Sequence, residues 1–151
     1  MVKHELSIII QRPVSEVFAF VSDLTNGPQW QTGLVESRNQ TKGLLGVGTK
    51  FASVRKFLGR KIEGLVEITE YEPNSKFVIK SASGMAPFEE TYLFEPTSNG
   101  TKLSTVFKLH TSGLMGLAEP MIVGGLKREM DADFGDLKDI LESRMPEITA
   151  P

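Results

Sequence analysis

The chain has 151 residues, the size of one domain, with a formal net charge of -2 and no cysteine. This balance excludes a basic nucleic-acid binder, and the missing cysteines exclude disulfides, thiolate zinc sites and cysteine nucleophiles. The N-terminus lacks the apolar core of a signal peptide, and no stretch approaches the roughly 20 apolar residues of a membrane span. We therefore expect a cytoplasmic globular protein with no membrane span and no nucleic-acid partner.

The chain opens with a strand that turns at once into a short helix. Leu6–Gln11 is β-branched and apolar, which is typical of a strand. Pro13 suits the first turn of a helix, where its missing N–H costs nothing. The apolar residues that follow recur at helical spacing on one face: Val14, Val17, Phe18 and Val21. Thr25–Pro28 ends this helix, and we expect a second short turn to carry Trp30.

The middle of the chain is typical of an antiparallel meander. A strand begins near Leu34, and a turn with asparagine and glycine at Thr97–Lys102 separates the last two strands. The other predicted strands are Gly48–Leu58, Arg60–Tyr71, Lys76–Ser83, Phe88–Pro96 and Lys102–His110.

The register of the first hairpin in this meander depends on the turn at Gly59. A two-residue turn at Gly59–Arg60 pairs Phe57 with Ile62. The same turn sets Lys56 opposite Glu63, which is a favourable charge pair. The side chains that then share one face are Phe51, Ser53, Arg55 and Phe57 with Ile62, Gly64, Val66 and Ile68. A three-residue turn would reverse one strand against the other.

Two charged residues fall on apolar faces of these strands. Arg55 shares the face of the phenylalanines, with Gly64 opposite or nearly so, and Glu90 alternates with Phe88 and Tyr92. An unpaired charge beneath a sheet is costly. Either Arg55 and Glu90 pair inside a cavity, or one strand is displaced by a residue and both charges are in water.

The chain ends in a long helix that Pro120 begins and Pro146 stops. Its apolar residues recur at three- and four-residue steps: Met121, Ile122, Leu126, Met130, Phe134, Leu137, Ile140 and Leu141. This stripe must lie against the one available sheet. Gly124–Gly125 indicates a kink, a close approach by a ligand or strand, or a helix that begins only after Gly125.

Other motifs for catalysis or cofactors are weak. His4 and His110 are far apart without a carboxylate cluster, so we assign no metal. Gly43–Gly48 does not open a helix after a strand, which indicates a loop rather than a phosphate site. Glu89 and Glu90 are neighbours on a strand and point to opposite faces, so they cannot act as a paired acid and base. We assign no catalytic residue and no cofactor.

Three segments stand out in the order of these elements: "IIIQRPVSEVFAFVSD" (Ile8–Asp23) with Trp30, "FEPTSNGTKL" (Phe94–Leu103) and "DFGDLKDILES" (Asp133–Ser143). With this order they resemble the START-like, helix-grip (SRPBCC) superfamily, which includes the birch-pollen-allergen-like proteins. These segments are most similar to its polyketide cyclase/dehydrase and lipid-transport branch. The resemblance implies an α+β fold: a curved antiparallel sheet of about seven strands around a long C-terminal helix, with two short helices after the first strand. Residues 1–146 would form one such domain, with 147–151 as a tail.

The resemblance also implies a cavity for a small hydrophobic, aromatic or lipid-like molecule between sheet and helix. The residues that we expect to bind this ligand are Trp30, Phe51, Arg55, Phe57, Phe77, Phe88, Glu90, Tyr92, Phe107, Met121, Leu126 and Met130. A carrier or sensor that is not an enzyme fits the missing acid/base cluster best. One alternative is a cyclase/dehydrase-type enzyme that uses Arg55, Glu90 or Tyr92. Another is an accessory protein that docks on a partner, resembling an accessory subunit of carbon monoxide dehydrogenase. The sequence leaves open the ligand's identity and whether the chain forms a homodimer.

Overall fold

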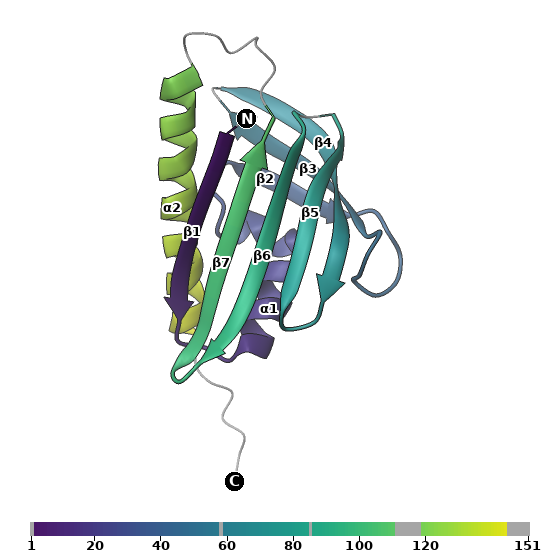
Figure 1. Ribbon diagram of the computed structural model, residues 1–151. Helices are drawn as coiled ribbons and strands as arrows, with labels where there is room; N and C mark the ends of the chain where they lie inside the picture. The colour runs from purple at the N-terminus through teal and green to yellow at the C-terminus, as the bar shows by residue number, and fades with distance from the viewer. Residues whose placement is uncertain (1, 58, 85, 111–118, 145–151) are drawn as a thin grey trace.

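The computed structural model describes residues 2–57, 59–84, 86–110 and 119–144, apart from the side chains of residues 119 and 122 (Figure 1). The predicted stop at Pro146, the tail 147–151 and the side chain of Ile122 therefore lie outside the described residues. The elements in chain order are β1 (Val2–Ile10), α1 (Val14–Ser22), the 3-10 helix η1 (Leu24–Gln29), β2 (Leu34–Asn39), β3 (Lys50–Phe57), β4 (Arg60–Glu72), β5 (Lys76–Ser83), β6 (Phe88–Thr97), β7 (Gly100–Leu109) and α2 (Glu119–Ser143).

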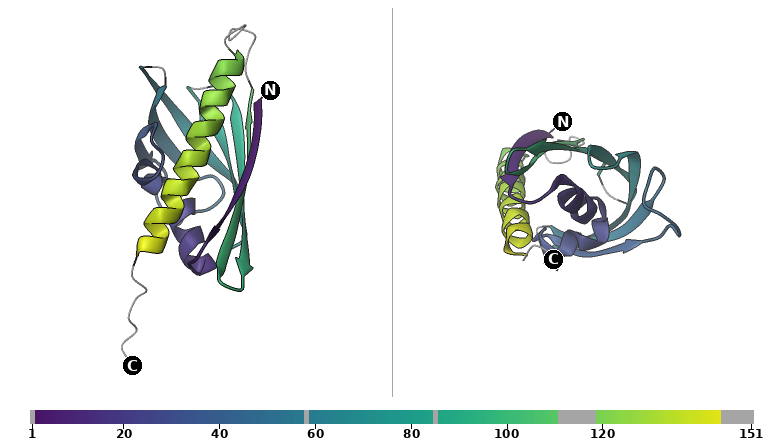
Figure 2. Two further views of the ribbon diagram at one scale, coloured as in Figure 1. Left: turned by 90° about the vertical axis from the view of Figure 1, so that its left-hand side faces the viewer. Right: turned by 90° about the horizontal axis from the view of Figure 1, so that it is seen from below.

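The seven strands form one antiparallel sheet in the order β1-β7-β6-β5-β4-β3-β2. The sheet curls around α1, and α2 lies along the open side, next to the edge strand β1 (Figure 2). This arrangement confirms the predicted curved sheet, the long C-terminal helix and the two short helices after the first strand. β1 begins at Val2, earlier than the predicted Leu6, and Pro13 lies directly before α1 rather than inside it.

The helix α1 fills one end of the curled sheet. Its Phe18 is buried, and its ring meets those of Tyr71, Phe77 and Phe94 edge-on, with centroid distances of 5.4, 6.0 and 5.0 Å. Edge-to-face contacts of this kind suit the charge distribution of aromatic rings. The concave face of the sheet is therefore closed by packed aromatic side chains at the α1 end.

The helix α2 buries its apolar stripe only in part. Met130, Phe134, Leu137 and Leu141 are buried, but Met121 is 83% exposed, so its predicted place against the sheet is wrong. Successive helical residues turn by about 100°, which puts Met121, nine positions before Met130, on the opposite side. The helix is continuous through Gly124–Gly125, so the interpretation that it begins after Gly125 is also wrong.

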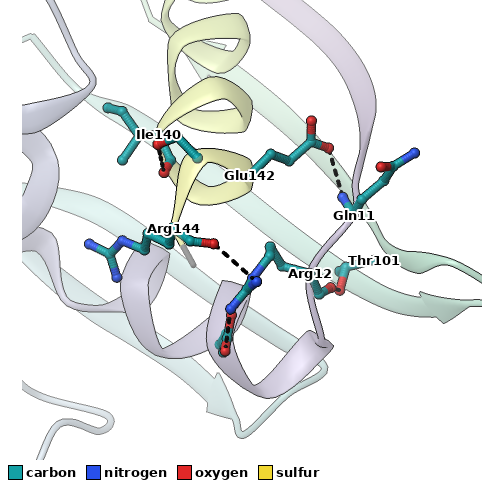
Figure 3. A network of polar contacts seen from close by, with 8 residues as sticks. Gln11, Arg12, Thr101, Ile140, Glu142 and Arg144 are labelled. Carbon is teal, nitrogen blue, oxygen red and sulfur yellow. Dashed lines mark hydrogen bonds and ion pairs between the residues drawn. The ribbon is translucent and has the colours of Figure 1, made fainter. Parts of the chain in front are cut away.

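Polar contacts fasten α2 to β1 and to the turn that follows it. Nε2 of His4 lies 2.8 Å from Oδ1 of Asp131, and the ammonium of Lys138 donates to the backbone carbonyl of Ile9. At the end of the helix, the backbone N–H of Gln11 donates to Glu142 at 2.8 Å (Figure 3). These contacts align the C-terminal part of α2 with the edge of the sheet.

The register between β3 and β4 differs from the prediction by two residues. Phe57 pairs with Arg60, and Lys56 faces Lys61 rather than Glu63. Gly59 has a φ of 76°, a left-handed conformation that glycine adopts without strain and that suits a two-residue hairpin turn. A shift of two residues keeps every side chain on its predicted face, because side chains alternate along a strand.

Two neighbouring pairs of residues show the outcome of that shift. Arg55 lies opposite Ile62, so the predicted position of Gly64 across from Arg55 is wrong. Gly64 instead faces Ser53. The predicted shared face is confirmed, because Phe51 and Arg55 pair with Val66 and Ile62.

In the part of the chain that the structure describes, no helix is both long and apolar enough to cross a membrane.

Candidate functional site

A cavity of about 480 Å³ lies between the concave face of the sheet, η1 and α2. Most of its wall is apolar, with contributions from β2 to β7 and from the middle of α2. This volume falls within the range of sites for small organic molecules, which are concave and mostly apolar with few polar groups.

Most of the residues predicted for the wall do line this cavity. Those that do are Trp30, Phe51, Arg55, Phe57, Phe88, Glu90, Tyr92, Phe107, Leu126 and Met130. Met121 does not, because it lies on the outer side of α2. Phe77 does not either: its ring stacks on Tyr92 at 4.4 Å and is covered by Phe18 of α1. It therefore belongs to the packed core.

Trp30 is held at the cavity by the short helix before it. Asp23 caps η1 by accepting hydrogen bonds from the backbone N–H and the hydroxyl of Thr25. Trp30 follows at the end of η1 and is only 5% exposed. Its ring lies 5.1 Å from that of Phe134, which also lines the cavity and is 6.3 Å from the ring of Tyr92. The sole tryptophan of the chain thus forms part of the wall.

Glu90 is the centre of a buried polar cluster on β6 and β7. The hydroxyl of Tyr92 donates to Oε1 of Glu90 at 2.9 Å, and the hydroxyl of Thr105 donates to Oε2 at 2.7 Å. Glu90 is 7% exposed, whereas its neighbour Glu89 lies on the outer face within 3.6 Å of Lys80. The predicted separation of the two glutamates is therefore confirmed, and a water-exposed Glu90 is ruled out.

Arg55 lines the same cavity, on the opposite part of the sheet. Its Nη2 donates to the side-chain oxygen of Gln31 at 2.7 Å. Among the described residues, the ion pairs do not include Arg55 or Glu90, so the direct pair, one of the two alternatives that the sequence left open, does not form. The two residues instead face one cavity, each with a neutral hydrogen-bond partner.

Two carboxyl groups of α2 complete this end of the cavity. Asp133 is buried and accepts hydrogen bonds from the backbone N–H and the hydroxyl of Thr32, at 3.1 and 3.0 Å. Glu129 approaches Gly33: a Cβ at that glycine would lie 2.7 Å from Oε1 of Glu129 and 3.4 Å from Nη1 of Arg55. The missing side chain of Gly33 leaves room for both charged groups.

The environment of the cavity disfavours negative charge. Burial raises the pKa of Glu90 above its ordinary value, although its two hydroxyl donors and the charge of Arg55 act the other way. Burial likewise raises the pKa of Asp133, against the hydrogen bonds from Thr32 and the charge of Arg55. The pKa of Tyr92 is raised by burial and by the nearby Glu90, so its phenol keeps its proton.

Sequence reasoning missed several residues of the wall. The polar ones are Gln31, Ser37, Ser53, His110, Glu129 and Asp133, and the apolar ones are Leu24, Leu34, Ile62, Val66, Ile79, Ala86, Pro87, Leu109 and Phe134. Strand alternation already put Ile62 and Val66 on this face. Glu129 and Asp133 lie four residues apart, and each directly precedes an apolar residue of the stripe, Met130 or Phe134. This spacing is the one sequence signal that the two acids adjoin the stripe.

Within the described residues, no group of three or more His, Asp or Glu side chains is arranged to hold a metal ion.

Comparison with protein families gives a match to the model described as polyketide cyclase/dehydrase and lipid transport, over residues 1–142. The chain belongs to this family. The membership confirms the predicted resemblance to the cyclase and lipid-transport branch, and it supports a ligand-binding or cyclase-type role in broad terms. No curated protein matches the chain.

Solved structures with the same fold share little sequence with this chain. TTHA0849 from Thermus thermophilus superposes with a TM-score of 0.79 at 17% identity, covering 92% of this chain and 96% of that one. A START superfamily protein from Mycobacterium smegmatis gives 0.76 at 12% identity, over 94% and 98%. The di-domain ARO/CYC BexL from the BE-7585A biosynthetic pathway gives 0.74 at 16% identity, over 95% of this chain and 50% of BexL. At these identities the likeness concerns the fold alone.

Proposed function

We propose that the chain binds a small apolar or aromatic molecule in the cavity between the sheet and α2, as a carrier or sensor. One observation carries the proposal: a cavity of about 480 Å³ whose wall is mostly aromatic and aliphatic, with a few polar groups at defined positions. Apolar burial supplies the affinity in such a site, and the polar groups set the orientation of the ligand.

Trp30 provides a direct test of this proposal. Because its ring is buried in the wall beside Phe134, a ligand that enters changes the surroundings of the indole and its emission. We expect apolar compounds to shift the Trp30 emission and to raise the melting temperature, since a ligand that binds only the folded state stabilises it. Native mass spectrometry against a denatured control would reveal a ligand that co-purifies. If no apolar compound changes either signal, the carrier function is wrong.

A cyclase/dehydrase-type reaction is the second candidate. It is favoured by one specific observation: Glu90, with its raised pKa, and Arg55 line the same apolar cavity. An acid with a raised pKa in such a cavity suits proton transfer. The test compares Tyr92→Phe and Glu90→Gln with the native protein, on any ligand that co-purifies or binds. Loss of water from the ligand, seen by mass only with the native protein, would establish the enzyme, and an unchanged ligand would favour the carrier.

The proposal of an accessory protein has less support. The exposed large apolar side chains of the described residues come from five segments, and only Leu44 and Val47 share one: Ile9, Val35, Leu44, Val47, Leu93 and Met121. Scattered exposed apolar residues are normal on a protein surface and do not by themselves indicate a docking surface.

A further inference from the structure

The charged groups of the cavity indicate what the polar end of its ligand is. We propose that the ligand is an uncharged apolar molecule whose polar end is a hydroxyl group, and that the cavity excludes carboxylates. This inference rests on the proposed binding function and deepens it. It departs from the simplest expectation for Arg55, in which a cation in an apolar cavity holds an acidic ligand.

The balance of charge in the wall carries the first step. Arg55 is the permanent cation of the wall, and His110 is its other basic side chain, whereas three carboxyl groups line the same cavity: Glu90, Glu129 and Asp133. The charge of His4 also acts on Glu90. The charge of Arg55 already acts on the pKa of both Glu90 and Asp133. A ligand carboxylate would be a fourth acidic group around one guanidinium, and like charges in a partly dehydrated space repel strongly.

The second step rests on the raised pKa values of two carboxyl groups in the wall. Burial raises the pKa of Glu90 and of Asp133 even though Arg55 is close enough to favour their ionised forms. The cavity thus penalises negative charge more than Arg55 compensates for it. The same desolvation would act on the carboxylate of a ligand, whereas an ionised Glu90 would add direct repulsion.

The hydrogen-bonding groups distinguish a hydroxyl from a cation. Each oxygen of the Glu90 carboxyl accepts one hydrogen bond from protein and has a second lone pair. Arg55 carries five N–H groups, and one of them is bonded to Gln31. A hydroxyl both donates and accepts, so it finds a partner at either residue. An ammonium group is attracted by the acids, but it only donates, so it is repelled by Arg55 and leaves the N–H groups of Arg55 without a partner. A carboxylate only accepts and meets the three acids.

A matched series of ligands tests the inference. Para-butylbenzyl alcohol, para-butylbenzoate and protonated para-butylbenzylamine share one skeleton and differ in the polar end, and para-butyltoluene is the apolar parent. Affinities are measured by calorimetry and by Trp30 emission. We expect the alcohol to bind about tenfold or more tightly than either charged compound, equivalent to about 1.4 kcal/mol or more. If neither the alcohol nor the parent binds, the proposed function fails. If both bind and the benzoate binds as tightly as the alcohol, only this inference fails.

Variants distinguish repulsion by the acids of this wall from the cost of dehydrating a charged ligand, which any apolar cavity would impose. In Glu90→Gln and in Glu129→Gln, one acidic group is removed with little change of shape. Measured above the folded-state pKa of Glu90, where its carboxyl group is ionised, each should improve the binding of the benzoate relative to the alcohol by roughly threefold to tenfold. Glu89→Gln is the matched control, because Glu89 is the neighbour of Glu90 on the outer face, and it should leave the ratio unchanged. If Glu90→Gln does not fold, Glu129→Gln on α2 still gives the result. A ratio that neither substitution changes, or that Glu89→Gln changes equally, overturns the inference.

Discussion

The two halves of α2 have different surroundings. From Met130 to Leu141 the helix buries most of its apolar side chains, and two polar side chains, Asp131 and Lys138, bond to β1. Before Met130, Met121 is exposed, and Leu126 and Glu129 line the cavity.

This difference teaches how one helix serves both stability and binding. A side chain that packs tightly leaves no space for a ligand, and one that borders a cavity gives up part of its packing. Along α2 the balance of the two tasks changes with position. Leu126 and Glu129 border the cavity, Met130, Asp133 and Phe134 border it and are also buried, and Leu137 and Leu141 only pack. Variants along the helix should therefore have different effects.

The largest effect should come from Phe134, which is 2% exposed and contacts Trp30 and Tyr92. Phe134→Ala removes a large buried ring and should lower the free energy of unfolding by about 3–5 kcal/mol. Met121→Ala, in the other half, should change it by less than about 0.5 kcal/mol, because Met121 is 83% exposed. Urea unfolding measures both. A loss below about 1 kcal/mol for Phe134→Ala would place its ring outside the core.

The second prediction concerns the cavity wall that the first half of α2 faces. Because burial raises the pKa of Glu90 above its ordinary 4.5, the folded protein holds this proton more tightly than the unfolded chain. The stability that this contributes is fully present below about pH 4.5 and is lost as the pH rises through the folded-state pKa. Each unit by which the pKa is raised corresponds to about 1.4 kcal/mol.

The substitution Glu90→Gln replaces the titrating carboxyl group with an amide, so this loss of stability with rising pH does not occur in the variant. The free energy of unfolding of Glu90→Gln minus that of the native protein should therefore increase as the pH rises above about 4.5 and through the folded-state pKa of Glu90. Asp133 and Glu142 also titrate with shifted pKa values, but both are present in the two proteins, so their contributions cancel. Glu89→Gln serves as the control, with a difference that does not follow this pH dependence. A difference for Glu90→Gln that stays constant over this range would contradict a raised pKa.

Strand alternation made much of the fold and part of the site predictable. Counting along their strands put Arg55 and Glu90 on apolar faces, although the sequence left open whether they face a cavity or water. The error of two residues at Gly59 did not matter, because it preserves the face. The exposure of Met121 could also have been predicted by counting, since a residue nine positions from Met130 lies about two and a half turns away, on the opposite side of the helix. Steps of three and four residues conceal this, because each step departs from a whole turn and the departures add up along the helix.

The acidic groups from α2 could not be predicted in the same way. Glu129 and Asp133 border the apolar stripe, and whether such residues face solvent or a cavity depends on the rotation of the helix over the sheet. That rotation is set by tertiary contacts, such as the packing of Phe134 against Trp30 and the hydrogen bonds between Asp133 and Thr32. Residues so distant in the chain leave no local pattern that reveals these contacts.

Replacing one glycine in each half of α2 with alanine should distinguish the halves by a smaller change in the free energy of unfolding. At both Gly125 and Gly135, a Cβ would meet no heavy atom within 4 Å beyond the adjoining backbone of the helix, so alanine fits at both. Glycine in a helix interior is less stable than alanine by about 1 kcal/mol. Gly135→Ala should show most of this gain in urea unfolding. Gly125→Ala should show less, because the first half of the helix has fewer packing contacts and can open before the rest. Equal gains would mean that both halves unfold as one unit.

The smallest effect concerns the contact between His4 and Asp131, where the two halves meet. The two side chains lie 2.8 Å apart, but Asp131 is 60% exposed, so water and salt weaken their interaction. Asp131→Asn should therefore lower the free energy of unfolding by no more than about 1 kcal/mol, and added salt should reduce the difference from the native protein. Asp139→Asn alters an exposed carboxylate of the same helix and should have a smaller effect. If Asp131→Asn instead destabilises as much as Phe134→Ala, this one contact holds α2 on the sheet, and the buried side chains of its second half contribute less than their burial indicates.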